Sequence, residues 1–137
     1  NKSYLTPILK LQRMTIRIIY SVPFRENLDS FHEQSNILNF SYIYNFFTGL
    51  FVFKYRKGML PDIFESLFEY LQHHYHTRNL PQTLNIPHCN STLGKMRMRY
   101  MGAKIHNHAI KHIQWNNSYQ AFKCSLKKFL IVDPFSY

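Results

Sequence analysis

The densest run of apolar residues in the chain lies in the segment Ile37–Pro61. Asn39 or Ser41 can cap a helix at the start of this run, because their side-chain oxygens accept hydrogen bonds from first-turn amides. Gly58 follows the run and readily adopts the left-handed conformation that ends helices. The pattern predicts a helix over residues 40–57 that is apolar on almost every side, and such a helix must be surrounded by other elements. We therefore expect this helix to form the core of the fold.

Amphipathic patterns on both sides of the apolar run predict shorter helices. The first begins at Pro7, which suits the first helical position, and ends before Pro23. Its apolar face comprises Ile8, Leu11, Thr15, Ile18, Ile19 and Val22. The last is capped by Asn117 or Ser118 and ends at Asp133. Further short helices are expected over residues 29–34, 62–72 and 103–112.

Residues 95–101 show a different pattern, because basic and apolar residues alternate strictly there. A period of two places Lys95, Arg97 and Arg99 on one side and the methionines on the other, as in a strand or an extended arm. Residues 73–91 lack any periodicity and are expected to be irregular. The sequence therefore predicts one mainly α domain over residues 1–137. Five or six helices surround one long buried helix, with at most a short β element near residues 95–101.

The charge balance of the chain indicates what kind of partner it binds. The 137 residues include 17 lysines and arginines against 7 aspartates and glutamates, a formal net charge of +10. A chain this basic favours phosphate-rich partners, of which nucleic acid is the commonest. Hydrophobic residues make up 45% and aromatic residues 17%, which argues against disorder. Cys89 and Cys124 have no partner pattern around them, so we expect reduced thiols in an intracellular protein of the nucleus or cytoplasm.

Basic and aromatic residues supply the candidate nucleic-acid contacts. The cations of the first helix recur at helical spacing on a face without acidic residues, and those near residue 97 share one side of the alternating segment. Arg78 offers a planar fork for phosphate, and Tyr75 can stack on an unpaired base. The alternatives are a solvated helix face and a loop pinned by Arg78. The candidate binding residues are Lys10, Arg13, Arg17, Tyr75, Arg78, Lys95, Arg97, Arg99, Lys104, Lys123 and Lys127.

Other kinds of site find little support in the sequence. The 8 histidines do not fall into a recognised zinc-ligand spacing with either cysteine, so no metal and no cofactor are expected. Neither cysteine has a histidine and an orienting group in a catalytic pattern, and no small-molecule substrate is expected. The apolar run is short for a bilayer span, which needs about 20 residues, so no membrane partner is expected. A membrane-surface role for the basic first helix stays open as a weaker alternative.

Several phrases in a fixed order carry a resemblance to a known family. They are LTPILKLQRMTIRII at Leu5–Ile19, the central run at Asn36–Phe64, HHYHTRN at His73–Asn79, RYMGAKIHN at Arg99–Asn107 and SYQAFKCSLKKFLI at Ser118–Ile131. In these phrases the chain resembles the C-terminal region that follows the polymerase in reverse transcriptases of LINE-type (non-LTR) retrotransposons, of the jockey-like and chicken-repeat-like kind. The resemblance covers nearly the whole chain.

The chain departs from the family's phrases in the segment 103–109. Ala103 stands where the family usually has proline, and His106 where it usually has tryptophan. The proline that the family has after its Trp-Asn phrase is absent, and His108 and Ala109 stand there instead. Since the chain also does not begin with methionine, we expect it to be part of a longer polypeptide.

The resemblance implies a parent polypeptide that copies RNA into DNA, an RNA-directed DNA polymerase. It does not imply that this segment is catalytic, because the aspartates here are Asp29, Asp62 and Asp133, none of them adjacent. We expect a non-catalytic segment that grips template RNA or target DNA and adjoins the upstream polymerase domain of the same polypeptide. The alternative is a structural or protein-interaction module that braces the polymerase thumb without touching nucleic acid.

Overall fold

Helices account for most of the described chain. A computed structural model describes residues 5–71 and 82–133. No sheet forms within these two ranges, where an isolated antiparallel bridge pairs Tyr70 with Leu84. The mainly α fold class predicted from the sequence is confirmed. The helices are α1 (Leu5–Tyr20), α2 (Asp29–Ser35), α3 (Ile43–Arg56), α4 (Thr92–Lys95), α5 (Met98–Ala109) and α6 (Tyr119–Val132), with 3-10 turns η2 (Phe40–Tyr42) and η3 (Asp62–Phe64).

Turn η2 and helix α3 together form the central helix predicted over residues 40–57. The side-chain oxygen of Asn39 caps its first turn, accepting a backbone hydrogen bond at 3.0 Å. At its other end Gly58 has a φ of 64°, in the left-handed region. The amide of Met59 then donates to the carbonyl of Lys54 at 2.9 Å, the bond that closes a Schellman motif. Both predicted ends of the central helix are confirmed.

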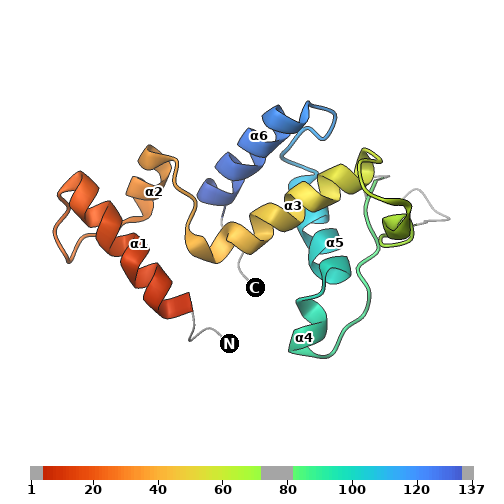
Figure 1. Cartoon of the computed structure of the whole chain (residues 1–137), viewed down its shortest axis with the longest axis horizontal. Helices are drawn as coiled ribbons and strands as arrows, with labels where there is room; N and C mark the ends of the chain where they lie inside the picture. Colours follow the sequence, from red (N-terminus) through yellow and green to blue (C-terminus); the bar gives the residue numbers. More distant parts are fainter. Residues whose placement is uncertain (1–4, 72–81, 134–137) are drawn as a thin grey trace.

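Helix α3 lies between α5 and α6, and the main core forms along it (Figure 1). Phe53 is 1% exposed and stacks on Phe122 of α6, with ring centroids 4.3 Å apart. On the α5 side, Gly102 has no room for a side chain. A Cβ atom there would lie 2.5 Å from Cζ of Phe68 and 3.0 Å from Cγ2 of Val52. Gly102 thus lets α3, α5 and Phe68 approach closely.

One strip of α3 stays at the surface. Tyr44 is 45% exposed and Phe47 is 62% exposed, although the sequence predicts burial on almost every side. The two residues are three positions apart and so share a helix face. We call this pair the aromatic strip.

The prediction of a helix over residues 62–72 is wrong. Of the described residues 62–71, Asp62–Phe64 form the 3-10 turn η3, and residues 65–71 do not continue it as a helix. The amide of Leu71 donates to the carbonyl of Thr83 at 2.8 Å, and Phe68 is buried beneath Gly102. These tertiary contacts take the place of the helical hydrogen bonds that the local pattern favours.

The prediction of a strand or an extended arm at residues 95–101 is also wrong, because these residues end α4 and begin α5. Their alternation coincides with a second, helical spacing. Met98, Met101 and Ile105 stand at i, i+3 and i+7, and Met101 and Ile105 are 1% and 3% exposed. The side chains that pack in the core therefore follow the helical period rather than the period of two.

Helix α1 is confirmed but begins and ends two residues earlier than predicted, and most of its predicted apolar face is not packed. The exposed residues of this face, which we call the outer face of α1, are Ile8 (41% exposed), Leu11 (64%), Ile18 (77%) and Ile19 (61%).

Two other residues of α1, Gln12 and Ile16, meet the rest of the fold. Ile16 packs with Val22 and Leu28 in a small cluster of its own. The side chain of Gln12 donates to the carbonyl of Leu38 and accepts from the amide of Phe40, both at 2.9 Å. These bonds fix α1 to η2.

Candidate nucleic-acid interface

The basic residues proposed from the sequence fall on separate elements. Figure 1 shows α1 at the left end, α4 at the lower right and α6 along the top, so the proposed cations do not form one surface. Tyr75 and Arg78 lie outside the described residues. The described candidates are Lys10, Arg13 and Arg17 on α1, Lys95, Arg97, Arg99 and Lys104 on α4, α5 and the turn between them, and Lys123 and Lys127 on α6.

On α1 the three cations differ in their surroundings. Lys10 and Arg13 are exposed. Arg17 donates to the carbonyl of Pro23 and, at 3.0 Å, to the carbonyl of Glu26, and its guanidinium lies 5.3 Å from the ring centroid of Phe24. Arg17 thus holds the turn between α1 and α2, while Lys10 and Arg13 face solvent.

Lys95 and Arg97 flank the junction between α4 and α5, and we call this pair the basic junction. Both side chains are exposed, and no acidic side chain in the described part of the chain forms an ion pair with either. Arg97 is the N-cap of α5, and no side chain caps that helix end. The first-turn amides of α5 and its helix dipole therefore add positive potential beside the two cations, which suits a phosphate group.

Arg99 and Lys104 continue along α5 but are less available. Arg99 forms an ion pair with Glu69, although both side chains remain well exposed. Such surface pairs contribute little to stability, so a phosphate can compete for Arg99. Lys104 is half-buried. On α6, Lys123 is exposed and Lys127 is half-buried.

A contact joins the basic junction to the aromatic strip. The hydroxyl of Tyr44 donates to the carbonyl of Met96, the residue between Lys95 and Arg97, at 2.7 Å. Sequence reasoning missed the aromatic strip as a site. Two polar residues of α3, Asn45 and Thr48, are 0% and 1% exposed, so they do not mark the face that stays outside.

The carboxyl end of α3 holds a second cation–aromatic arrangement that the sequence did not reveal. The Lys54 ammonium lies 5.4 Å from the ring centroid of Tyr119, and the Arg56 guanidinium 5.2 Å from that of Trp115. These cations are therefore partly engaged by aromatic faces of the core.

Arg56 also belongs to a buried polar network around His106. Arg56 donates to Nε2 of His106 at 3.2 Å, so Nδ1 carries the ring proton and donates to Oδ1 of Asn107 at 3.2 Å. Asn107 in turn bonds both the amide and the carbonyl of Leu84 at 2.8 Å. The His106 ring packs on Trp115 with centroids 4.7 Å apart. Burial, with a smaller effect from the Arg56 charge, lowers the pKa of His106 to about 4, and the Asn107 hydrogen bond opposes this shift.

Other site chemistry is sparse in the described ranges. Across residues 5–71 and 82–133, no three histidine, cysteine or acidic side chains gather closely enough to hold a metal ion. In the same ranges, no helix combines the length and apolar character that crossing a bilayer requires.

Comparisons of the chain with protein-family models, with curated proteins and with solved structures return no match.

Proposed function

We propose that this chain binds nucleic acid through exposed basic residues, as a non-catalytic C-terminal segment of a LINE-type reverse transcriptase. The observation that carries the binding proposal is the basic junction, where Lys95 and Arg97 are exposed beside an α5 terminus that no side chain caps. Such an arrangement favours phosphate over neutral ligands. The polypeptide context rests on the resemblance alone. In that context the ligand is template RNA or target DNA inside the cell, and the neighbour is the polymerase domain.

Affinity for RNA should depend steeply on salt, and on the basic junction in particular. Each phosphate contact that is lost should lower the slope of log affinity against log salt by about 0.7 to 0.9. The double variant Lys95→Glu/Arg97→Glu should therefore lower the slope by about 1.5 or more and weaken binding at low salt. A labelled RNA stem-loop titrated at two ionic strengths measures both quantities.

A control with the same change in net charge separates a defined site from diffuse attraction. Arg25 and Lys111 are exposed and lie outside the proposed contacts. The variant Arg25→Glu/Lys111→Glu should weaken binding less than the variant of the basic junction does. Equal losses in the two variants would argue against a site at the junction, and no binding by the unaltered protein at low salt would reject the function.

A second candidate function is packing against another protein domain, and the outer face of α1 favours it. This face presents apolar side chains to solvent over much of the helix, which is typical of an interaction surface. The partner in this case is the polymerase domain of the same polypeptide, which α1 would brace.

The outer face of α1 should make the isolated chain self-associate. The variant Leu11→Ser/Ile18→Ser should reduce self-association in sedimentation velocity and leave the thermal midpoint almost unchanged, because both side chains are already exposed. Ile63 lies outside α1 and is 83% exposed, and it supplies the control Ile63→Ser. Equal effects of the α1 and Ile63 variants, or a protein that is monomeric throughout, would remove this candidate.

A further inference from the structure

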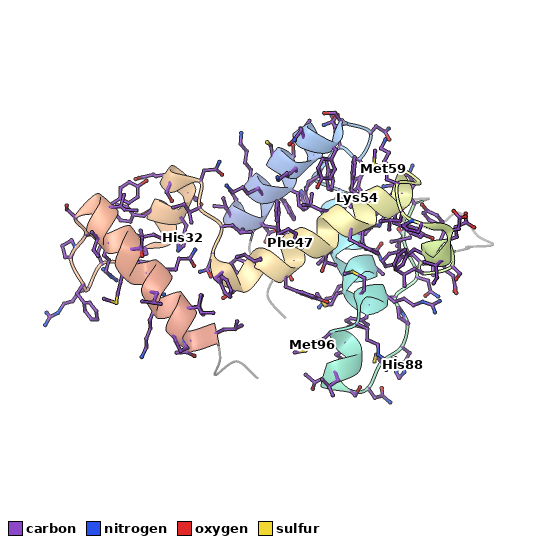
Figure 2. The ribbon with its side chains drawn as sticks, viewed as in Figure 1. His32, Phe47, Lys54, Met59, His88 and Met96 are labelled. Carbon is purple, nitrogen blue, oxygen red and sulfur yellow. The ribbon has the colours of Figure 1, made fainter. Side chains whose placement is uncertain are left out.

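The aromatic strip and the basic junction lie next to each other at the surface although they are far apart in the sequence. The bond from the Tyr44 hydroxyl to the Met96 carbonyl, 2.7 Å long, joins α3 to the chain between α4 and α5. Figure 2 labels Phe47 on α3 and Met96 at the start of the turn that leads into α5. Lys95 and Arg97 are the immediate neighbours of Met96, so both cations flank the residue that the Tyr44 hydroxyl contacts. Phe47 lies one turn further along α3.

The two rings of the aromatic strip are held rather than loosely exposed. The hydroxyl bond fixes the direction of Tyr44. Phe47 packs edge-on against Phe46, with ring centroids 5.6 Å apart and planes at 69°. Ordered rings lose less conformational entropy when a planar ligand stacks on them than free rings would. Their exposed fractions, 45% for Tyr44 and 62% for Phe47, leave ring surface for such a ligand.

We infer that Tyr44 and Phe47 stack on unpaired bases while Lys95 and Arg97 contact the adjoining phosphates, so that this surface binds single-stranded nucleic acid in preference to duplex. The inference rests on the proposed nucleic-acid binding and makes it more specific. Single strands offer a base face and a phosphate together, which is the pairing of chemistry found here. In a duplex the base faces are stacked on each other, and only the phosphates are available to the cations.

Single-stranded nucleic acid fits this surface better than a membrane surface or an apolar protein does. A membrane surface or an apolar protein would match the rings, but the uncompensated Lys95 and Arg97 call for an anionic ligand beside them.

The test compares a uridine oligonucleotide with an RNA duplex of the same length, using the full chain. Phe47→Leu keeps an apolar side chain and removes the ring, so it should weaken single-strand binding by about tenfold and leave duplex binding unchanged. Lys95→Glu/Arg97→Glu should weaken both. The matched control is Phe24→Leu, which removes another exposed ring, at 86% exposure, in the turn between α1 and α2. It should change neither affinity, and circular dichroism should show the same helix content in every variant.

The outcomes distinguish this inference from the function on which it rests. Single-strand preference that is lost in Phe47→Leu and kept in Phe24→Leu supports it. Equal binding of single strand and duplex, with Phe47→Leu silent and the basic-junction variant weakened, overturns the stacking surface and leaves nucleic-acid binding intact. Absence of binding to either RNA at low salt overturns both.

Discussion

Lowering the pH from 6.5 to 4 should destabilise the fold by about 3 kcal/mol through one side chain, His106. Burial lowers the pKa of this imidazole from 6.5 to about 4 in the folded chain. Between these two values the unfolded chain binds the proton and the folded chain does not. The neutral His106 imidazole therefore makes its full contribution to the folding free energy above about pH 6.5. This contribution declines as the pH falls and is lost below about pH 4.

The hydrogen-bond network around His106 explains why protonation should destabilise the fold. A proton on Nε2 would remove the acceptor for Arg56, which donates to that atom at 3.2 Å, and would place two cations side by side. The described hydrogen-bond partner of Nε2 is the Arg56 cation, and Nδ1 already donates to Asn107. Neither partner can compensate the new charge. Acid should therefore loosen the junction between α3, α5 and the segment around Leu84.

Urea unfolding at a series of pH values measures this contribution. The variant His106→Gln should be less stable at pH 7 and should show a weaker dependence on pH between 4 and 6.5. The control His88→Gln alters an exposed histidine and should leave the dependence as it is in the unaltered chain. If the His106 and His88 variants had the same pH dependence, the buried neutral imidazole would be ruled out.

Replacing Phe53 with alanine should cost about 3 to 5 kcal/mol of unfolding free energy, the range seen when a large buried aromatic is truncated. Phe53 is 1% exposed and lies at the centre of an aromatic group from two other parts of the chain. Its ring is 4.3 Å from Phe122, 6.1 Å from Tyr119 and 6.4 Å from Trp115, measured between centroids. Truncation leaves a cavity that these rings cannot fill without moving α6 toward α3.

The same helix provides a matched control of the same residue type. Phe47 lies on α3 two turns before Phe53, with 62% of its surface exposed. Phe47→Ala should change the unfolding free energy by no more than about 0.5 kcal/mol, as is usual at exposed sites. Chemical unfolding of both variants gives the comparison. Similar losses at the two positions would mean that α3 is not oriented as described.

The central helix could be predicted because its signals are local. Its apolar run, the Asn39 cap and the left-handed Gly58 are each readable over a few residues, and all three agree. Helix α6 was predictable for the same reason, with Ser118 as its N-cap and buried residues at helical spacing.

The errors arose where contacts distant in sequence override the local pattern. Residues 62–72 favour a helix by composition, but Phe68 is buried against Gly102 and the chain pairs instead with the segment at Thr83. At residues 95–101 two periodicities coexist, and only burial of Met101 decides between them. Nothing within either segment indicates which residue of another element it will meet.

The candidate site was predictable in its charges and not in its geometry. Basic residues are exposed almost wherever they occur, so Lys95 and Arg97 could be proposed from composition and spacing. The neighbouring ring of Tyr44 belongs to an apolar run, and Tyr44 is 52 residues from Met96 in the sequence. Its approach to Met96 depends on how α4 and α5 pack on α3. That packing is a property of the whole fold.

We expect an RNA strand to bind at the basic junction and the aromatic strip together. Titrating a uridine oligonucleotide into isotopically labelled protein and following the backbone amide resonances tests this residue by residue. The largest shifts should fall at Tyr44, Phe47 and residues 95–98, and the resonances of the outer face of α1 should stay unchanged. Shifts spread evenly over the basic residues of α1, α5 and α6, or no shifts at low salt, would contradict this expectation.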